Sequence, residues 1–435
     1  MRPITRKLLK RSLILVLAAA LLLAGLGVSA PAAVQAMPPM TGSSGLVCTT
    51  NPSNTFTLTA KAGSISLTDG NIVPMWGYAP GGVHGFQYPG PVLCVDQGAT
   101  VTVVLHNTLP ADVSIVFPGQ QDVLADGAPA QAVLDGLGTL TSLVKPAAAN
   151  GGSVTYSFVA GEPGTYLYYS GTDPVRQVKM GLAGALIVRP ALGANFVYNS
   201  ADTQFNPDAE FMLFLSEIDP LLNHAVSQGL PFDMDTYHPR YWLINGRGLP
   251  DTLAPNHASW LPNQPYGGLI RTYPYDATTN PYPVLVRYLS VGTDDYPFHP
   301  HGNHFRVIAR DGRLLKGPLG EDTSYEKFTD VVGPGQTIDT LFTWHDANQW
   351  NEMTNPIPDP IPAVQDMVFG MWWSGSPYLG MMGSMPPGMM TLNQCGEYYI
   401  IAHNHALHQI VAWDVPMAGM ATFIRVDPPA PNMCP

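Results

Sequence analysis

Two pairs of histidines stand out in the sequence because one residue separates the members of each pair. The pairs are His299 with His301 in the stretch YPFHPHGNHF, and His403 with His405 in the stretch IAHNHALHQ. Residues i and i+2 of an extended strand face the same side, so each pair can direct two imidazoles at one metal. Imidazole suits copper, and three or four histidines suffice for one ion with an open water position. The spacing therefore predicts a metal site.

Other polar residues near these pairs have weaker claims to a role. His304 and His408 are out of phase with the pairs, so we expect them to lie outside the ligand set or on the surface. The remaining histidines have no metal-ligand spacing and are interpreted as structural. Ligating imidazoles are usually oriented by a second hydrogen bond, and Asp294 or Asp295 is near enough in sequence to accept one.

A methionine-rich segment is the second candidate for copper chemistry. About fifty residues lie between LFTW and Cys395, and long loops are usually functional or disordered. Thioethers are soft ligands for Cu(I), and the candidate residues are Met381, Met382, Met385, Met389 and Met390. The alternative is an apolar lid, because methionine and tryptophan pack well over irregular surfaces. The sequence contains no G-x-S-x-G, HExxH or glycine-rich phosphate motif, which disfavours a hydrolase.

The first 36 residues resemble a secretory signal peptide. Five basic residues and no acid precede or flank an apolar run, and Val34-Gln35-Ala36 fits a small-x-small cleavage site. The whole chain has a formal net charge of −12 and is more acidic without this segment, which argues against nucleic acid and anionic lipid as partners. No second apolar stretch is long enough to span a bilayer. We expect a periplasmic, extracellular or cell-surface protein, and the sequence leaves a homo-oligomer open.

Four cysteines form an even set. An oxidising compartment favours two disulfides over free thiols, and four cysteines allow three pairings. The pairing that we favour is Cys48–Cys94 and Cys395–Cys434, one disulfide in each half of the chain.

The elements that carry the histidines are predicted to be strands. The chain contains 43 glycines and 43 prolines with only 12% charged residues, which is typical of turn-rich β-structure. Runs with period-two alternation at 88–120 and 162–190 reappear in the same order at 283–312 and 395–429. This internal repeat predicts two similar β-sandwiches with a linker near 190–207.

Several phrases give the repeat a family likeness. FPGQ after VSIV, GLAGALIV, PFHPHGNHF and AGMATFIRV resemble the cupredoxin domains of the multicopper oxidases, especially the two-domain members that are laccase-like or like copper nitrite reductase. The resemblance implies an all-β fold of two tandem cupredoxin-like Greek-key sandwiches. The expected domains are 46–190 and 205–435, and the second carries a methionine-rich insertion at about 345–394.

The resemblance also shows where the first half has lost its ligands. Family members hold a three-copper cluster with four His-x-His pairs. At the first two pairs this chain reads SIVFPG and YLYYSG, so the ligand positions are occupied by Val116, Pro118, Tyr169 and Gly171. The third and fourth pairs survive. By the resemblance His299 would serve a type 2 copper, and the other three would serve a type 3 pair.

The type 1 copper site of the family is also missing. Tyr296 and Gln409 stand where the family has histidines, and Asn404 stands where it has the cysteine. The leading hypothesis is a secreted multicopper-oxidase-like protein with one type 2-like mononuclear copper and no type 1 copper. One alternative is a metal-free extracellular or cell-surface scaffold, and another is a copper-dependent oxidoreductase of unknown substrate. If the protein is an enzyme, we expect it to be a copper-dependent oxidoreductase and not a standard laccase.

Overall fold

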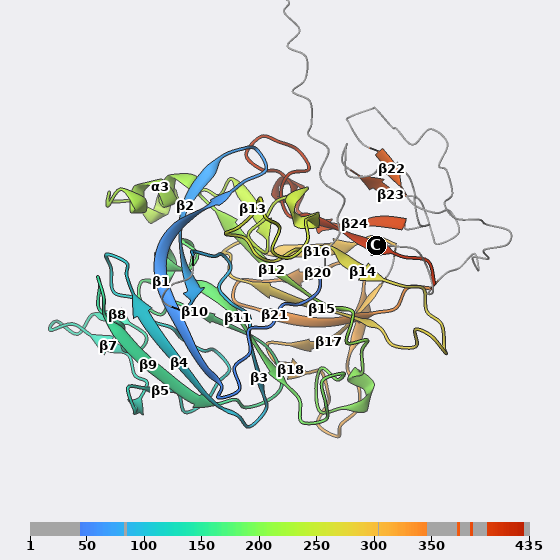
Figure 1. The fold of residues 1–435 in the computed structure, drawn as a ribbon, viewed down its shortest axis with the longest axis horizontal. Helices are drawn as coiled ribbons and strands as arrows, with labels where there is room; N and C mark the ends of the chain where they lie inside the picture. Colours follow the sequence, from blue (N-terminus) through green and yellow to red (C-terminus); the bar gives the residue numbers. More distant parts are fainter. Residues whose placement is uncertain are drawn as a thin grey trace, which may run out of the picture. The chain divides into compact units, whose positions relative to one another are not determined.

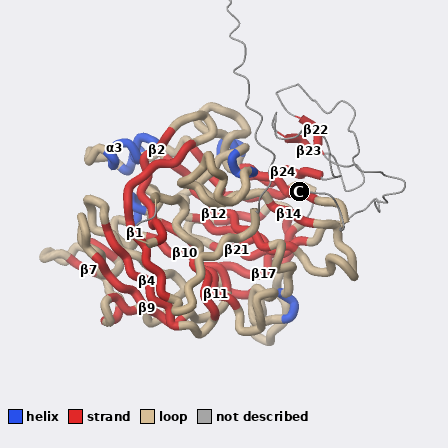
Figure 2. The backbone as a smooth tube through the Cα atoms, in the orientation of Figure 1, coloured by secondary structure: helices blue, strands red, loops and turns tan. Residues whose placement is uncertain are grey.

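Strands make up most of the regular structure, as Figures 1 and 2 show. The computed structural model describes residues 44–81, 85–302, 304–345, 372–374, 383–385 and 398–429. Its short helical elements are α2 (Pro174–Gln177), α3 (Pro220–Ser227), η1 (Ala201–Thr203), η2 (Met234–Thr236), η3 (Asp251–Leu253) and η5 (Leu407–Ile410). The predicted all-β fold is confirmed. None of the described helices has the length and apolarity needed to cross a bilayer.

The first half of the chain forms two main sheets. One has the order β2-β1-β4-β9-β5-β6, the other has the order β10-β11-β3, and a small hairpin pairs β7 with β8. Their bounds are β1 Thr55–Ser66, β2 Ile72–Pro80, β3 Leu93–Asp96, β4 Thr100–Asn107, β5 Leu124–Ala125, β6 Ala128–Pro129, β7 Val133–Leu134, β8 Leu140–Ser142, β9 Ser153–Val159, β10 Gly164–Tyr169 and β11 Ala183–Arg189.

The second half repeats this arrangement with longer sheets. One sheet has the order β13-β12-β15-β21-β17-β18 with β19 on β17, a second has the order β14-β25-β24-β16-β20, and β22 pairs with β23. Their bounds are β12 Glu210–Ile218, β13 Tyr241–Ile244, β14 Ile270–Thr272, β15 Val284–Ser290, β16 Tyr296–Pro300, β17 Phe305–Arg310, β18 Arg313–Leu314, β19 Tyr325–Lys327, β20 Asp330–Val332, β21 Thr337–Phe342, β22 Trp372–Ser374, β23 Gly383–Met385, β24 Tyr398–Asn404 and β25 Ala421–Val426.

Residue patterning explains which strands lie at the surface and which lie inside. In β4, TVTVVLHN, buried and more accessible side chains alternate, as expected for a strand with one face on a core. In β12, EFMLFLSEI, and in β15, VLVRYLS, every residue is buried. These two strands are covered on both faces because a shared hydrophobic cluster packs the halves together, with Leu167 and Ile187 from the first and Phe214 and Leu243 from the second.

A buried ionic network also joins the halves. Arg287 of β15 is 1% exposed, and its Nε donates to Glu210 Oε1 at 2.7 Å. Its Nη1 donates to Thr165 Oγ1 of β10 at 2.8 Å, and the Thr165 hydroxyl donates to Asp339 of β21 at 2.5 Å. Arg189 of β11 donates to the same Glu210 oxygen at 2.7 Å. Charges buried this completely are stable only when paired, so the network holds the two halves in one arrangement.

Several sequence predictions concern the limits of the halves. β11 ends at Arg189 and β12 begins at Glu210, so the change from one set of sheets to the other falls where the sequence predicts a linker. The domain limits themselves stay a prediction. Cys48 and Cys94 form a disulfide, the pairing favoured from the sequence.

Other predictions fall outside the described residues. These are the signal peptide at 1–36, the cysteines Cys395 and Cys434, most of the insertion at about 345–394, and Met381, Met382, Met389 and Met390. Met385 ends β23, but its side chain is not described. The Cu(I) role of these methionines stays a prediction.

Candidate metal centre

Neighbouring strands β16 and β24 carry the two histidine pairs. The strands are antiparallel, with Phe298 opposite Asn404 and His299 opposite His403. Directly opposed residues project from the same face of a sheet, so these two imidazoles lie side by side. In β16 the burial pattern alternates, with Phe298 buried in the core and His299 on the other face. Figure 1 shows both strands in the sheet beside β14 and β20.

Three of the four histidines converge. One ring nitrogen each of His299, His301 and His403 lies within 4.8 Å of the others. The ring centroids are 4.6 Å apart for His299 and His301, 5.6 Å for His299 and His403, and 5.1 Å for His301 and His403. The Nε2 atoms of His301 and His403 are 3.1 Å apart. Two nitrogens bound to one ion at about 2.0 Å in a tetrahedral arrangement would lie about 3.3 Å apart, so His301 and His403 already have the spacing of two ligands on one metal, and His299 lies beside them.

His405 lies beside this group and not within it. Its ring centroid is 4.9 Å from that of His299 and 5.6 Å from that of His403, on which it stacks at 24°. It follows the last residue of β24 and is exposed. His301 is also exposed, so the group is open to solvent on that side. His304 is exposed too, with its ring 5.9 Å from the Phe328 ring and outside the convergent set.

Backbone carbonyls orient two of the rings. His299 Nδ1 is 2.5 Å from Phe328 O and 2.8 Å from Thr329 Oγ1, and His403 Nδ1 is 2.7 Å from Asn404 O. A carbonyl oxygen only accepts, so each Nδ1 carries the proton and Nε2 keeps its lone pair. This is the tautomer that a metal at Nε2 requires.

The surroundings also favour the uncharged form of two of the rings. Partial burial of His301, which is exposed on its outer side, followed by the neighbouring rings of His299, His403 and His405, lowers its pKa to about 4. Burial is also the main reason that the pKa of His403 lies below its usual value. Metal ions bind the neutral imidazole, so at neutral pH both rings are in the ligating form.

The orienting groups differ from those expected. Asp294 accepts hydrogen bonds from Trp242 Nε1 at 2.9 Å and from Gln409 Nε2 at 3.3 Å, and not from an imidazole. The groups that do orient the rings are the carbonyls of Phe328 and Asn404. No side-chain pattern marks a carbonyl acceptor in a sequence, so residue types could not have located them.

Hydrogen-bonding side chains, those of Asn404, Gln409 and Tyr296, occupy the place where the resemblance leads us to expect type 1 copper ligands. Asn404 Nδ2 donates to Gln409 Oε1 at 2.5 Å and contacts Met420 Sδ at 3.3 Å. The hydroxyl of the fully buried Tyr296 donates to Glu217. Burial raises the pKa of Glu217, although the Lys179 ammonium at 3.5 Å acts in the opposite direction. These side chains satisfy one another, so the place is a packed polar core.

The corresponding positions of the first half are closely packed as well. Val116 and Tyr169 exchange backbone hydrogen bonds at 2.8 and 3.2 Å. The backbone N–H of Gly171 donates to Ser114 Oγ at 3.1 Å, and a Cβ at Gly171 would lie 2.7 Å from Val116. Even a small side chain would not fit at Gly171 without a shift, so the first half is built without a ligand there.

Comparison with known proteins agrees with these observations. Residues 68–192 match the family model described as multicopper oxidase. The chain is therefore similar to multicopper oxidases over this segment, which is less than a third of its length. The matched segment lies in the first half and includes Val116, Pro118, Tyr169 and Gly171, the positions at which the sequence predicts lost ligands.

The curated proteins to which the chain is similar are distant from it. It is 28% identical to laccase-24 of Oryza sativa subsp. japonica over 265 residues, which is 59% of this chain but 38% of that laccase. It is 31% identical to L-ascorbate oxidase of Cucurbita maxima over 170 residues, 38% of this chain and 26% of that enzyme. The chain thus spans well under half the length of these relatives.

A solved structure has the same fold. The blue copper oxidase from Nitrosomonas europaea superimposes with a TM-score of 0.55 at 18% identity, over 86% of this chain and 85% of that one. At this identity the likeness establishes the cupredoxin-type architecture alone.

Proposed function

We propose that this multicopper oxidase relative binds a single copper ion in the second half of its chain. His299, His301 and His403 would hold the ion, and His405, also predicted as a ligand from the sequence, lies beside them. The observation that carries the proposal is the convergence of three ring nitrogens within 4.8 Å. Two carbonyls support it further by holding the protons of His299 and His403 on Nδ1.

The ligand set suggests a type 2-like centre. A copper ion held by imidazoles and open to solvent would act as a Lewis acid and would exchange one electron between Cu(I) and Cu(II). The chain's own groups orient His299 and His403, keep His301 and His403 neutral, and leave the His301 side accessible. Asn404 and Tyr296 replace type 1 ligands, so we propose no blue copper, no four-electron reduction of oxygen and no standard laccase activity.

The proposed location is outside the cytoplasm, either periplasmic, extracellular or at the cell surface. The proposal rests on the signal-peptide features of residues 1–36 and agrees with the disulfide between Cys48 and Cys94. Copper storage, detoxification or an oxidation at the single centre would all use this site. Sequencing the amino terminus of the exported protein tests the location, and a retained Met1 would contradict it.

Copper stoichiometry tests the function directly. The purified protein is loaded with Cu(II), desalted and analysed for metal content and by electron paramagnetic resonance. We expect about one copper per chain, a type 2-like spectrum and no intense band near about 600 nm, because Asn404 stands where a thiolate ligand is expected and no cysteine of the described residues adjoins the cluster. The His301→Ala/His403→Ala double variant is the control and should retain almost none. A wild-type chain that keeps no copper would instead support the metal-free scaffold.

A further inference from the structure

A hollow of about 530 Å³ lies at the junction of the two halves, away from the histidine cluster. The turn between β1 and β2 forms one side, and β13, the start of α3 and the turn around Trp413 form the others. Figure 1 shows β2, β13 and α3 together at the upper part of the molecule. None of the four predicted copper ligands lines this hollow.

A rigid polar group occupies the side of the hollow next to β1. The hydroxyl of the buried Tyr241 donates to Asp69 Oδ2 at 2.7 Å. Asn71 Nδ2 donates to the same carboxylate oxygen at 2.8 Å and to the Tyr241 oxygen at 2.9 Å, and the Asn71 backbone N–H donates to Asp69 Oδ1 at 3.0 Å. These bonds fix the carboxylate and amide side by side, with Asn71 Oδ1 unpaired among the described residues.

An exposed aromatic ring lies opposite. The Trp413 side chain is 43% exposed, and the ring lies 6.1 Å from the Tyr241 ring. The guanidinium of Arg240, which does not line the hollow, lies 5.5 Å from the indole centroid. The backbone N–H of Trp413 donates to Arg240 O at 2.7 Å. The indole is thus held in place while it borders the hollow.

The backbone at Trp413 is strained. Its φ is +54°, a left-handed conformation that is a genuine outlier for a bulky side chain. Such outliers persist where the surrounding structure enforces them, and they concentrate at ligand-binding positions. An exposed tryptophan held in this conformation is a reason to look for a ligand.

We propose that this hollow binds a neutral saccharide unit. A pyranose ring has an apolar face of C–H groups, which packs on an aromatic ring, and a rim of hydroxyls, which exchange hydrogen bonds with carboxylate and amide groups. Trp413 provides the aromatic face, and the Asp69–Asn71 pair provides the polar groups. Ile72 at 69% and Val415 at 44% exposure extend the apolar border.

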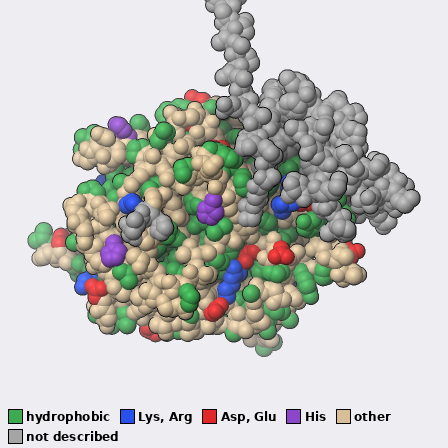
Figure 3. Space-filling view, viewed as in Figure 1, with side chains coloured by type: hydrophobic (Ala, Val, Ile, Leu, Met, Phe, Trp, Pro, Cys, Tyr) green, Lys and Arg blue, Asp and Glu red, His purple; other side chains and the backbone are tan. Residues whose placement is uncertain are grey.

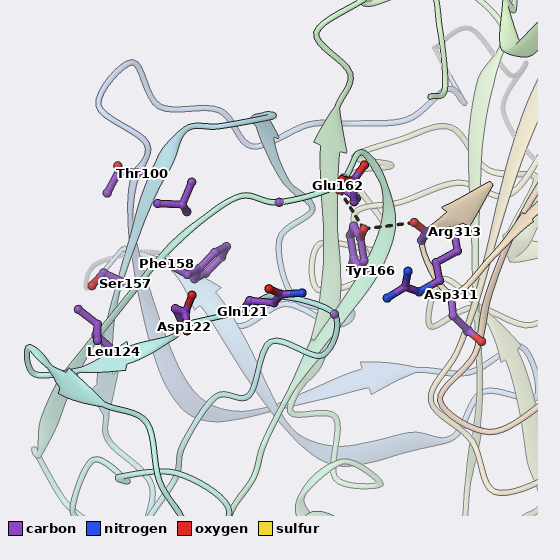
Figure 4. Close-up of a pocket in the computed structure, with 14 residues that line it drawn as sticks. Thr100, Gln121, Asp122, Leu124, Ser157, Phe158, Glu162, Tyr166, Asp311 and Arg313 are labelled. Carbon is purple, nitrogen blue, oxygen red and sulfur yellow. Dashed lines mark hydrogen bonds between the residues drawn. The ribbon is translucent and has the colours of Figure 1, made fainter. Parts of the chain in front are cut away.

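A second hollow lacks the exposed aromatic ring that saccharide stacking requires. Figure 4 draws a cavity of about 460 Å³ between the halves, with Gln121, Glu162 and Arg313 among its lining side chains. Its aromatic residues, Phe158 and Tyr166, are 3% and 6% exposed, so neither offers an open face. Polar side chains alone do not make a stacking site, and we assign no saccharide there.

Binding of defined sugars tests the proposal. Cellotriose, xylotriose, chitotriose and maltotriose are titrated into the full exported chain and followed by saturation-transfer NMR and calorimetry. We expect at least one to bind with a dissociation constant of about 1 mM or tighter. Trp413→Ala should weaken that binding by about tenfold or more, because it removes the stacking face. Trp413→Phe should retain most of it.

The matched control is Trp260→Ala. Trp260 is 41% exposed, similar to Trp413, but it does not line the hollow, so its loss should change affinity by less than about twofold. Thermal melting of each variant verifies that it is folded. The proposal is overturned if no trisaccharide of the panel binds with a dissociation constant of about 1 mM or tighter, or if Trp413→Ala binds the sugar as well as wild type. Choline is included as a cationic probe, and binding of choline in place of the sugars would also overturn it.

Discussion

At the scale of single residues, the positions at which the sequence predicts lost type 1 copper ligands are filled by side chains that hydrogen-bond to their neighbours. A buried polar atom without a partner costs about 1–3 kcal/mol, so losing copper ligands leaves a demand for new hydrogen bonds. Gln409 accepts a hydrogen bond from Asn404 and donates one to Asp294. The Tyr296 hydroxyl donates to Glu217. The same strand β24 still presents His403, because alternate residues face opposite sides.

The converging rings predict unequal roles for the histidines. We expect His403→Ala to weaken Cu(II) binding by about tenfold or more, because it removes one of three converging imidazoles. His405→Ala should weaken binding less, since that ring lies outside the group. The exposed His304 supplies the matched control, and His304→Ala should leave affinity unchanged. Competition with a chelator gives the ranking, and equal losses at His304 and His403 would show the strand register to be wrong.

At the scale of elements, the register of β16 on β24 makes the site. Pairing His299 with His403 brings together residues about a hundred positions apart, and a shift by one residue would turn one pair to the opposite face. This register is held by the core-facing side of the sheet, where Phe298 and Ala402 are buried in the core of the second half. Mutations that disturb the packing of that sandwich should therefore also disturb the arrangement of the histidines.

The ionic contact between β12 and β15 predicts a pH-dependent stability. Burial alone would raise the pKa of Glu210, but Arg287 and Arg189 outweigh it and hold the pKa below its usual value. A carboxyl with a depressed folded pKa stabilises the fold above its unfolded pKa of about 4.3, and this stabilisation is lost as the pH falls through the folded value. Glu210→Gln should therefore cost about 3–5 kcal/mol of unfolding free energy at pH 7. The difference in unfolding free energy between wild type and Glu210→Gln should become smaller at more acidic pH.

Urea unfolding of wild type and variant at several pH values measures this effect. The control is Asp322→Asn, which breaks an exposed pair with Arg306 at 3.5 Å and should cost no more than about 1 kcal/mol. A deficit for Glu210→Gln that stays constant down to the most acidic pH would contradict the assignment.

At the scale of the whole molecule, few charges and much uncharged surface meet the solvent. The face in Figure 3 shows scattered charged side chains among hydrophobic and uncharged ones, as expected from 12% charged residues. The stability of the fold must therefore come chiefly from the hydrophobic cores, the contacts between the two halves and the Cys48–Cys94 disulfide. The halves share one hydrophobic cluster and the Arg287 network, so they should unfold together.

The disulfide should contribute measurably to that unfolding. Cys48 and Cys94 are 46 residues apart, and the bond ties the segment before β1 to β3. Closing a loop of this length restricts the unfolded chain, so Cys48→Ser/Cys94→Ser should lower the unfolding free energy by about 2–4 kcal/mol. Non-reducing peptide mapping should recover the crosslinked peptide from wild type. Recovery of Cys94 linked to Cys395 would instead refute the pairing.

Much of this protein follows from its sequence alone. Alternating strands, glycine- and proline-rich turns and the repeated order of segments determine an all-β chain, because strand periodicity is a local property. The two His-x-His pairs and the substitutions at Val116, Tyr169, Tyr296 and Asn404 are equally legible, since they depend on residue type and spacing. These features identified the fold and the family likeness, and they predict the histidines that would bind copper.

Tertiary structure decided what spacing could not. It separated His405 from the other three rings, assigned the orienting roles to the carbonyls of Phe328 and Asn404, and gave Asp294 to Trp242 and Gln409. It also brought Asp69, Asn71 and Trp413 to one hollow from opposite ends of the chain. The physical reason is the same in each case, because these contacts depend on how distant strands pack and on backbone atoms that every residue carries.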